Sequence, residues 1–131
     1  MMHSNNKRIL VVDDEPDITI SISAVLESND LEVTSYNDPL LALTSFRRRY
    51  YDLVILDIMM PKMDGFQLYH EIKKKDHKAK VCFLTASELY YEEFRKREYD
   101  AIDKNLFIRK PIENEESGNR NEIRSIHCFA C

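Results

Sequence analysis

The sequence lacks several features that mark membrane-bound, secreted and nucleic-acid-binding proteins. No apolar run approaches the roughly 20 residues that a membrane-spanning helix needs, and the polar start MMHSNNKRIL does not resemble a signal peptide. The formal net charge of −4 argues mildly against nucleic acid as the main partner. Glycine is rare, with only Gly65 and Gly118. These absences predict a soluble, cytoplasmic protein that binds neither membrane nor nucleic acid.

Cysteine is scarce as well. Cys82 lies in the apolar run KVCFLT and is expected to be a buried thiol. The other two cysteines, Cys128 and Cys131, have the spacing of a redox or metal-ligand pair, but they lie in the last four residues with no second pair. We interpret that spacing as accidental. An odd cysteine count without a framework spacing fits a reducing cytoplasm.

The chain has 131 residues, 44% hydrophobic and 32% charged, which is the size and composition of one ordinary globular domain. Short apolar runs, each expected to be a strand, lie at residues 8–12, 31–36, 52–57, 80–85 and 106–110. The first, third and fourth are almost continuously apolar, as is typical of strands buried on both faces of a parallel sheet.

Helical patterns fill the gaps between these runs, at residues 17–29, 38–49, 65–75 and 88–99. In the second, Asp38 is the expected N-cap and Pro39 the first helical residue, while the arginines at 47–49 suit a helix C-terminus. Strands that alternate with helices predict a doubly wound α/β fold, with right-handed crossovers and helices on both faces of a parallel sheet.

The end of the chain departs from this pattern. A fifth helix begins near Pro111, but Gly118 and the asparagines around it interrupt it, so we expect it to be short or irregular. We therefore predict one domain over residues 7–114, followed by an irregular or frayed tail over 115–131 of truncated or artificial origin.

Polar side chains follow the predicted strands at their carboxyl ends, where an open parallel sheet binds its ligands. Asp13 and Asp14 follow the first strand, Asp57 ends the third and Thr85 ends the fourth. Lys110 ends the fifth. These groups converge only if the strand order is 2-1-3-4-5, which places the first and third strands side by side.

Three carboxylates in one partly desolvated pocket repel each other, and Lys110 alone cannot balance them. A hard divalent cation such as Mg²⁺ is the natural addition. With it, these residues suit phosphoryl transfer to an aspartate. Each residue alone could instead cap a helix or lie at the surface. Such separate roles leave unexplained why acids, a hydroxyl and an ammonium share one edge of the sheet.

The segments ILVVDDEP, LVILDIMMPKMDGF, FLTA and LFIRKP resemble the signature segments of response-regulator receiver domains from two-component signalling. The resemblance covers about residues 7–114, with four motifs in the right order. It implies a flavodoxin-like fold with a five-stranded sheet in the order 2-1-3-4-5.

The resemblance also implies roles for single residues around the acidic edge. Asp57 matches the phospho-acceptor, and Asp14 matches the carboxylate that binds Mg²⁺, or Mn²⁺, directly. Asp13 matches its partner carboxylate, and the backbone carbonyl of Met59 would be a further metal ligand.

Further implied roles concern the switch. Thr85 matches the hydroxyl that turns toward the phosphoryl group, and Lys110 matches the lysine that pairs with a phosphoryl oxygen. The bond from Lys110 to Pro111 matches the cis peptide of the family. Phe107 matches an aromatic that changes rotamer on activation, although it could equally be a plain core residue.

The function implied is that of a signalling switch rather than a turnover enzyme. A sensor histidine kinase, a phosphotransfer protein or a small acyl phosphate would supply the phosphoryl group. The face formed by the fourth helix, fifth strand and fifth helix would then bind a downstream protein, with residues Tyr90, Tyr91, Glu92, Arg95 and Lys104. We expect a monomer or a weak dimer.

Three alternatives remain open. An FMN-binding domain of the same topology would need a neutral loop after the first strand, where this chain has DDEP. An aspartyl-phosphate hydrolase would carry an Asp-x-Asp pattern there, whereas these aspartates are adjacent. The third alternative is a receiver fold that serves as a docking module without phosphorylation.

Overall fold

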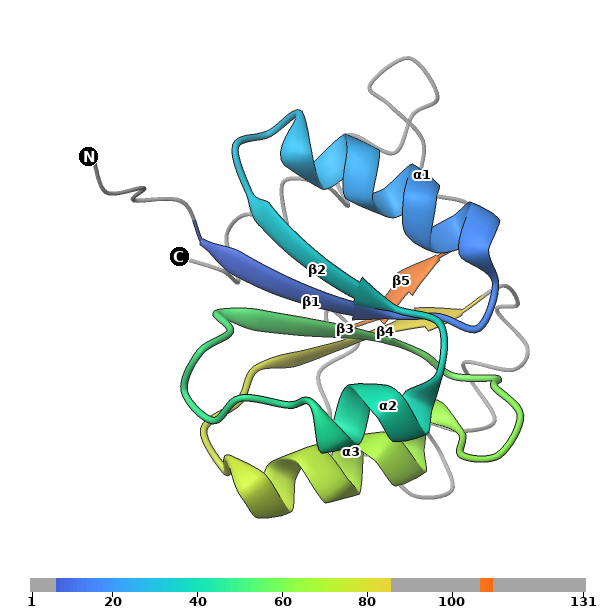
Figure 1. Ribbon diagram of the computed structural model, residues 1–131, viewed down its shortest axis with the longest axis vertical. Coiled ribbons are helices and arrows are strands. Elements are labelled where there is room, and N and C mark those ends of the chain that lie inside the picture. Colours follow the sequence, from blue (N-terminus) through green and yellow to red (C-terminus); the bar gives the residue numbers. More distant parts are fainter. Residues whose placement is uncertain (1–6, 86–106, 110–131) are drawn as a thin grey trace.

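The computed structural model describes residues 7–85 and the strand at 107–109. Strands and helices alternate along residues 7–85 (Figure 1). The elements are β1 (Arg8–Val12), α1 (Pro16–Glu27), β2 (Glu32–Tyr36), α2 (Pro39–Thr44), β3 (Leu53–Asp57), α3 (Gly65–Lys75), β4 (Val81–Thr85) and β5 (Phe107–Arg109).

All neighbouring strands pair in parallel, in the order β2-β1-β3-β4-β5. The predicted doubly wound sheet and its strand order are therefore confirmed. The register places Val12 of β1 beside Leu56 of β3, and Asp57 beside Leu84 of β4. The carboxyl ends of β1, β3 and β4 consequently meet at one edge of the sheet.

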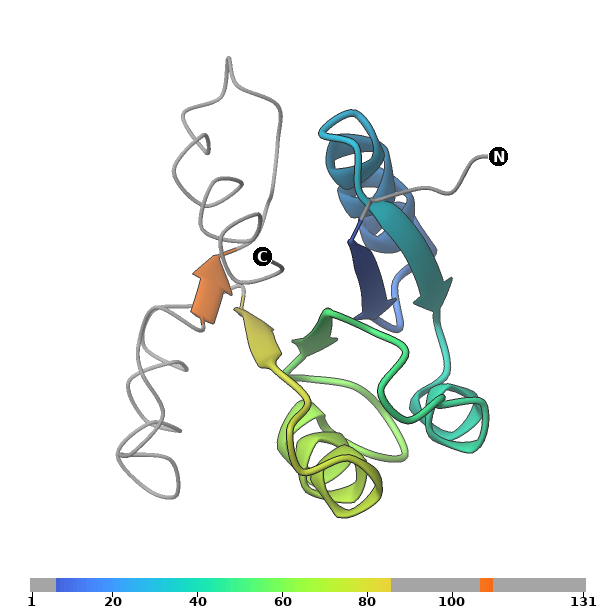
Figure 2. The same ribbon diagram turned by 90° about the vertical axis from the view of Figure 1, so that its left-hand side faces the viewer.

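Successive residues of each strand point to opposite faces of the sheet, and each face has its own apolar core. Helix α1 covers one face, and α2 and α3 cover the other (Figures 1 and 2). The α1 core includes Ile9, Val11, Ile22, Leu26, Leu53, Ile55, Cys82 and Leu84. The opposite core includes Leu10, Val12, Val54, Leu56, Phe66, Leu68, Ile72 and Phe83. Every residue of β3 is buried, as expected for a central strand covered on both sides.

Two of the helix starts are fixed by aspartate caps. The side chain of Asp38 accepts a hydrogen bond from the backbone N–H of Leu40, and Pro39 is the first residue of α2, as predicted. Asp64 caps α3 in a reciprocal arrangement: its carboxylate accepts from the backbone of Gln67, whose side chain accepts from the backbone N–H of Asp64.

The prediction that the second helix continues through the arginines at 47–49 is wrong, because α2 ends at Thr44. Arg49 has a φ of 59°, in the left-handed region that no helix interior tolerates, and its N–H donates to Asp76 Oδ2 at 3.0 Å. Arg47 instead lies over the ring of Tyr50, 3.9 Å from its centroid. The chain leaves the helix early, and Phe46 packs against Tyr51 with ring centroids 5.7 Å apart.

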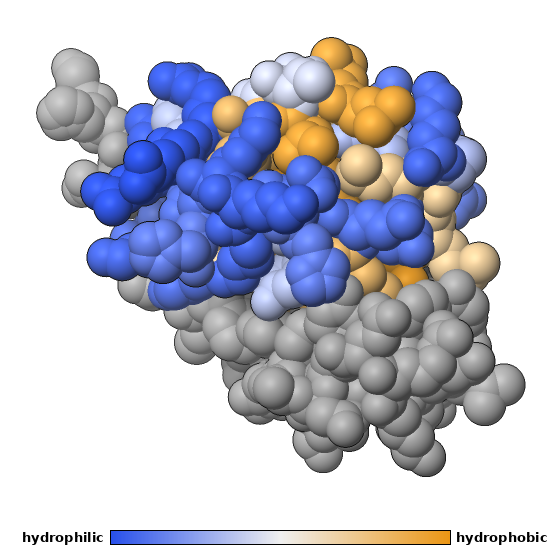
Figure 3. All heavy atoms as spheres, turned by 90° about the horizontal axis from the view of Figure 1, so that it is seen from below, coloured by the Kyte–Doolittle hydropathy of each residue, from blue (hydrophilic) through white to orange (hydrophobic). Residues whose placement is uncertain are grey.

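On the α2–α3 side, the part of the surface formed by the described residues is mostly hydrophilic, with apolar residues gathered in one part (Figure 3). The large apolar residues that are exposed in the described part of the chain are Ile20, Leu40, Leu41 and Met59. No helix in that part is long and apolar enough to cross a membrane.

Cys82 is a buried thiol, as predicted. Several other predictions lie outside the described residues: the helix at 88–99, the fifth helix, the tail at 115–131 and the pair Cys128 and Cys131.

Candidate functional site

Asp57 ends the buried strand β3 and is itself only 4% exposed. The backbone around it is held from two sides. The N–H of Ile58 donates to the carbonyl of Leu84 in β4, at 3.2 Å, and the carbonyl of Ile58 accepts from the N–H of Gly65 at the start of α3, at 2.8 Å. The carboxylate of Asp57, at the end of β3, therefore has a fixed position at the edge of the sheet.

Asp13 and Asp14 follow β1 directly. Asp13 is fully buried, whereas Asp14 is partly exposed. The backbone N–H of Asp13 donates to the carbonyl of Tyr36 at the end of β2, at 3.1 Å. Its carboxylate oxygen Oδ1 accepts from the N–H of Glu15 at 2.9 Å. This short-range hydrogen bond orients the Asp13 side chain before α1 begins.

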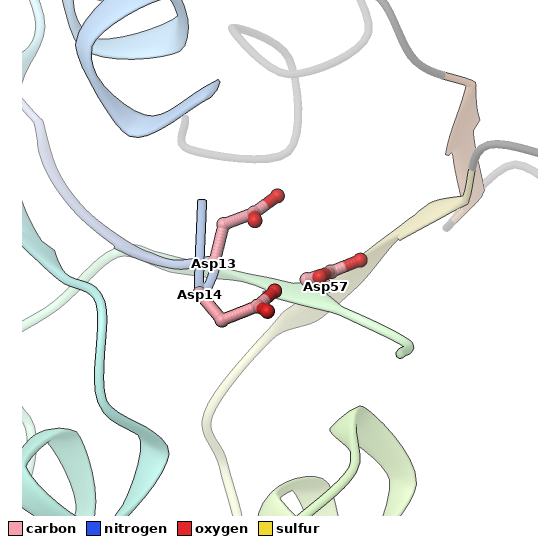
Figure 4. Close-up of side chains that lie close together, drawn as sticks. All are labelled: Asp13, Asp14 and Asp57. Carbon is pink, nitrogen blue, oxygen red and sulfur yellow. The ribbon is translucent and has the colours of Figure 1, made fainter. Parts of the chain in front are cut away.

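The three predicted carboxylates come together. Asp13, Asp14 and Asp57 each offer an oxygen atom, and these atoms all lie within 4.8 Å of one another. Figure 4 shows the side chains of Asp13 and Asp14 leaving the end of β1 toward the space in which Asp57 lies. Two unit charges at that separation repel by roughly 3.5 kcal/mol at an effective dielectric constant near 20.

The donor set of this cluster fits a hard divalent cation. Carboxylate oxygens are the ligands that Mg²⁺ prefers, and a bound cation would offset the repulsion among them. Asp13 and Asp57 are almost fully withdrawn from water, so bulk solvent screens their charges poorly. The geometry thus suits a metal centre built mainly from β1 and β3.

Gly65 is a site residue whose importance the sequence alone did not show. A Cβ atom added to it would collide with the carbonyl oxygen of Asp57 and lie 2.9 Å from the Cα of Ile58. Glycine is therefore needed here because the backbone of α3 approaches the backbone of Asp57 and Ile58 closely, and not because the chain turns through a left-handed conformation. The pair Asp64–Gly65 suggested only the start of a helix.

The connection from β3 to α3 carries the predicted metal ligand Met59, whose side chain is exposed. Lys62 in this connection has a φ of 71°, which is unfavourable for a side chain larger than glycine. Its Nζ lies 3.7 Å from Oδ2 of Asp38, linking the connection to the cap of α2. The role of the Met59 carbonyl stays a prediction.

Of the other predicted site residues, the described chain places only Thr85 and Phe107, by their positions in the sheet. Thr85 ends β4 and pairs with Arg109 of β5, so β5 leads toward the same edge of the sheet as β3 and β4. Phe107 lies in β5 beside Phe83. Lys110 and Pro111 follow this strand outside the described residues.

The model of the response regulator receiver domain family matches residues 9–120 of the chain. The chain belongs to this family. The resemblance inferred from its four motifs is therefore confirmed, and the cluster of Asp13, Asp14 and Asp57 is the acidic edge of a receiver domain.

Known proteins similar to this receiver domain fall into two groups. Among curated relatives, a probable transcriptional regulator ycf27 of Porphyra purpurea is 34% identical over 125 residues, 95% of this chain and 49% of its own length. Among solved structures, response regulator TrrA of Thermotoga maritima, in complex with Mg²⁺ and BeF, is 35% identical, with a TM-score of 0.68 over 88% of this chain and 96% of its own. The non-phosphorylated HemR receiver domain of Leptospira biflexa is 27% identical, with a TM-score of 0.75 over 95% and 94% of the two chains.

The receiver domain spans about half or less of the curated relatives that it matches first. In contrast, it covers nearly all of the solved receiver-domain structures. The similarity thus concerns the receiver portion of longer regulators.

The sequence also gave no indication of Asn37, the residue after β2. Its amide nitrogen Nδ2 donates to the backbone carbonyl of Asp13 at 2.8 Å and to Oγ1 of Thr19 at 3.0 Å. A polar residue next to an expected strand end is too common to be singled out, and the contact joins segments that are 24 residues apart. The structure thus adds a polar residue to the surroundings of the acidic edge.

Proposed function

We propose that this receiver domain is a phosphorylation switch that accepts a phosphoryl group on Asp57 with the help of Mg²⁺ or Mn²⁺. The observation that carries the proposal is the convergence of three carboxylates from β1 and β3 at one edge of the sheet. The donor would be a sensor histidine kinase, a phosphotransfer protein or a small acyl phosphate. A cytoplasmic location and a downstream protein target are part of the same proposal.

The chemistry is a displacement at phosphorus. A carboxylate oxygen of Asp57 attacks the phosphorus atom, a new O–P bond forms, and the bond between phosphorus and the donor's nitrogen or oxygen breaks. The electron pair of that bond leaves with the donor. Catalysis of such a transfer rests mainly on positioning and on charge neutralisation.

Each residue of the acidic edge has a defined part in this proposal. Asp14 and Asp57, with the carbonyl of Met59, would hold the metal ion, and Asp13 would support it from its buried position. The ion would supply positive charge to the oxygens of the transferring group. The rigid backbone around Asp57, held by β4 and by Gly65, keeps the nucleophile in place.

The switch would act through residues at the ends of β4 and β5. Thr85 would donate its hydroxyl to the new phosphoryl group, and Lys110 would pair with one of its oxygens. Phe107 and the Lys110–Pro111 peptide would adjust the face of the fourth helix, fifth strand and fifth helix, to which the downstream protein binds. A domain with these roles signals by changing shape and does not turn over a substrate.

The proposal is tested by incubating the protein with Mg²⁺ and acetyl phosphate or phosphoramidate and measuring its intact mass. We expect a gain of one phosphoryl group that Asp57→Asn and chelation of the metal both abolish. Asp17→Asn is a matched control, since Asp17 is an exposed aspartate in the first turn of α1. No gain in the wild-type protein with these donors or with a histidine kinase would favour a docking module that works without phosphorylation.

A further inference from the structure

Asn37 connects the end of β2 to the acidic connection between β1 and α1. Its Nδ2 donates to the Asp13 carbonyl at 2.8 Å and to Thr19 Oγ1 at 3.0 Å. The orientation of the amide is determined by its partners: a carbonyl oxygen only accepts, so the nitrogen and not the oxygen of Asn37 must face Asp13. Both hydrogens of the Asn37 amide group are used in this way.

Thr19 extends this hydrogen-bond network to the start of α1. Its side chain is buried, and Oγ1 donates to the carbonyl of Pro16 at 3.0 Å while it accepts from Asn37. The donors therefore follow one direction, from Asn37 to Thr19 to Pro16. This short network fastens the first turn of α1 to the end of β2.

The backbone of Asp13 is held at both of its polar groups by consecutive residues. Its N–H donates to the carbonyl of Tyr36 and its carbonyl accepts from Asn37. The carbonyl belongs to the peptide group that joins Asp13 to Asp14, and a peptide group is planar. Holding the oxygen therefore fixes the plane from which the Asp14 side chain departs.

We infer that Asn37 is a positioning residue for the metal centre. It touches neither metal nor phosphoryl group, but it fixes the peptide between the two acidic residues so that both carboxylates face Asp57 before the cation binds. The inference rests on the proposed function. Residues that orient metal ligands typically change metal affinity by 10- to 100-fold, and we expect Asn37→Ala to weaken Mg²⁺ binding by about tenfold.

The first test measures Mg²⁺ binding by isothermal titration calorimetry in wild type and Asn37→Ala. Asn29→Ala is the matched control, because Asn29 Nδ2 makes the same kind of bond, to the carbonyl of Val25 at 2.8 Å, at the far end of α1. We expect weaker binding in Asn37→Ala and wild-type affinity in Asn29→Ala. Equal affinities within twofold for wild type and Asn37→Ala would overturn the inference.

The second test separates positioning from a general loss of stability. In the metal-free protein, amide hydrogen exchange of Glu15, whose N–H donates to the Asp13 carboxylate, should become faster in Asn37→Ala but not in Asn29→Ala. Phosphoryl acceptance by Asn37→Ala should return to the wild-type rate at high Mg²⁺ concentration, because only the affinity is impaired. Unchanged exchange, or a rate defect that Mg²⁺ does not rescue, would contradict positioning.

Should Asn37→Ala fold poorly, a pair of substitutions at Thr19 serves the same purpose. Thr19→Val removes the acceptor of the Asn37 amide and should weaken Mg²⁺ binding, whereas Thr19→Ser keeps it and should not. Identical affinities in these two variants would count against the inference. A wild-type protein that binds no Mg²⁺ would overturn the proposed function and this inference together.

Discussion

The Cα atom of Gly65 lies against the backbone of Asp57, so that no side chain fits between them. The N–H of Gly65 also donates to the carbonyl of Ile58, the residue after Asp57, at 2.8 Å. The contact with the first residue of α3 thus fixes the position of the end of β3. The position of the expected phospho-acceptor depends on this contact as much as on β3 itself.

Gly65→Ala should destabilise the protein by about 1–3 kcal/mol, the usual cost of forcing extra atoms into a packed region. The sign of this stability change distinguishes the backbone contact from helix propensity, because alanine in a helix is normally favoured over glycine by about 1 kcal/mol. Urea unfolding measures the change, and phosphoryl acceptance on Asp57 should fall as well. A variant that is more stable than wild type would show that the contact with Asp57 relaxes freely.

Lys62→Gly should stabilise the protein by about 1 kcal/mol. Lys62 has a φ of 71°, which glycine adopts without strain. Its ion pair with Asp38 is 3.7 Å long and solvent-exposed, so losing it costs little. Lys62→Ala is the control, since it removes the ion pair but keeps the strained φ, and it should not exceed the wild-type stability. Equal urea midpoints for both variants would rule out relief of strain.

Much of this architecture follows from the sequence because the relevant signals are local. Continuous apolar runs identify β1, β3 and β4, and the order of the strands alone brings Asp13 and Asp57 to one edge. The pattern of a cap followed by proline is equally local, and it correctly starts α2 at Pro39.

Long-range contacts explain what the sequence did not reveal. The arginines at 47–49 suit a helix terminus by composition, but Asp76, 27 residues further on, binds the N–H of Arg49 in a left-handed conformation. The contacts of Gly65 with Asp57 and of Asn37 with Asp13 likewise depend on how separate segments pack. No local pattern encodes such pairings.

Tyr51→Phe should make the protein less sensitive to alkaline unfolding. Burial raises the pKa of Tyr51 above its ordinary value of 10.0, and the neighbouring Tyr36 and Tyr50 raise it further. The unfolded chain therefore releases this proton first. The contribution of Tyr51 to stability is complete below about pH 10 and is lost as the pH rises through the folded-state pKa.

Urea unfolding at neutral pH and at about pH 11 measures this effect. The comparison is made between the two pH values within each protein, so any effect of the substitution that does not depend on pH cancels. The wild-type stability should fall more than that of Tyr51→Phe between the two. Parallel losses in the two proteins would exclude a role for Tyr51.

Asp14→Asn should affect stability in opposite directions with and without Mg²⁺. Without the metal, removing one of three carboxylates whose oxygens lie within 4.8 Å relieves repulsion, and we expect a gain of about 1–2 kcal/mol, since Asp14 is partly exposed to screening solvent. With Mg²⁺ in excess, the wild-type protein gains stability in proportion to the logarithm of the metal concentration over its dissociation constant. Asp14→Asn should gain much less, because it has lost a ligand.

Thermal or urea unfolding across a Mg²⁺ titration therefore should show the two stability curves crossing. Asp17→Asn serves as the control, since Asp17 is exposed and outside the cluster, and its curve should run parallel to that of the wild type. A variant that is less stable than wild type in the absence of metal would mean that Asp14 is held by favourable contacts that outweigh its repulsion. Curves that never cross because Mg²⁺ stabilises neither protein would mean that the three carboxylates share no cation, since a ligand that binds only the folded chain must stabilise it.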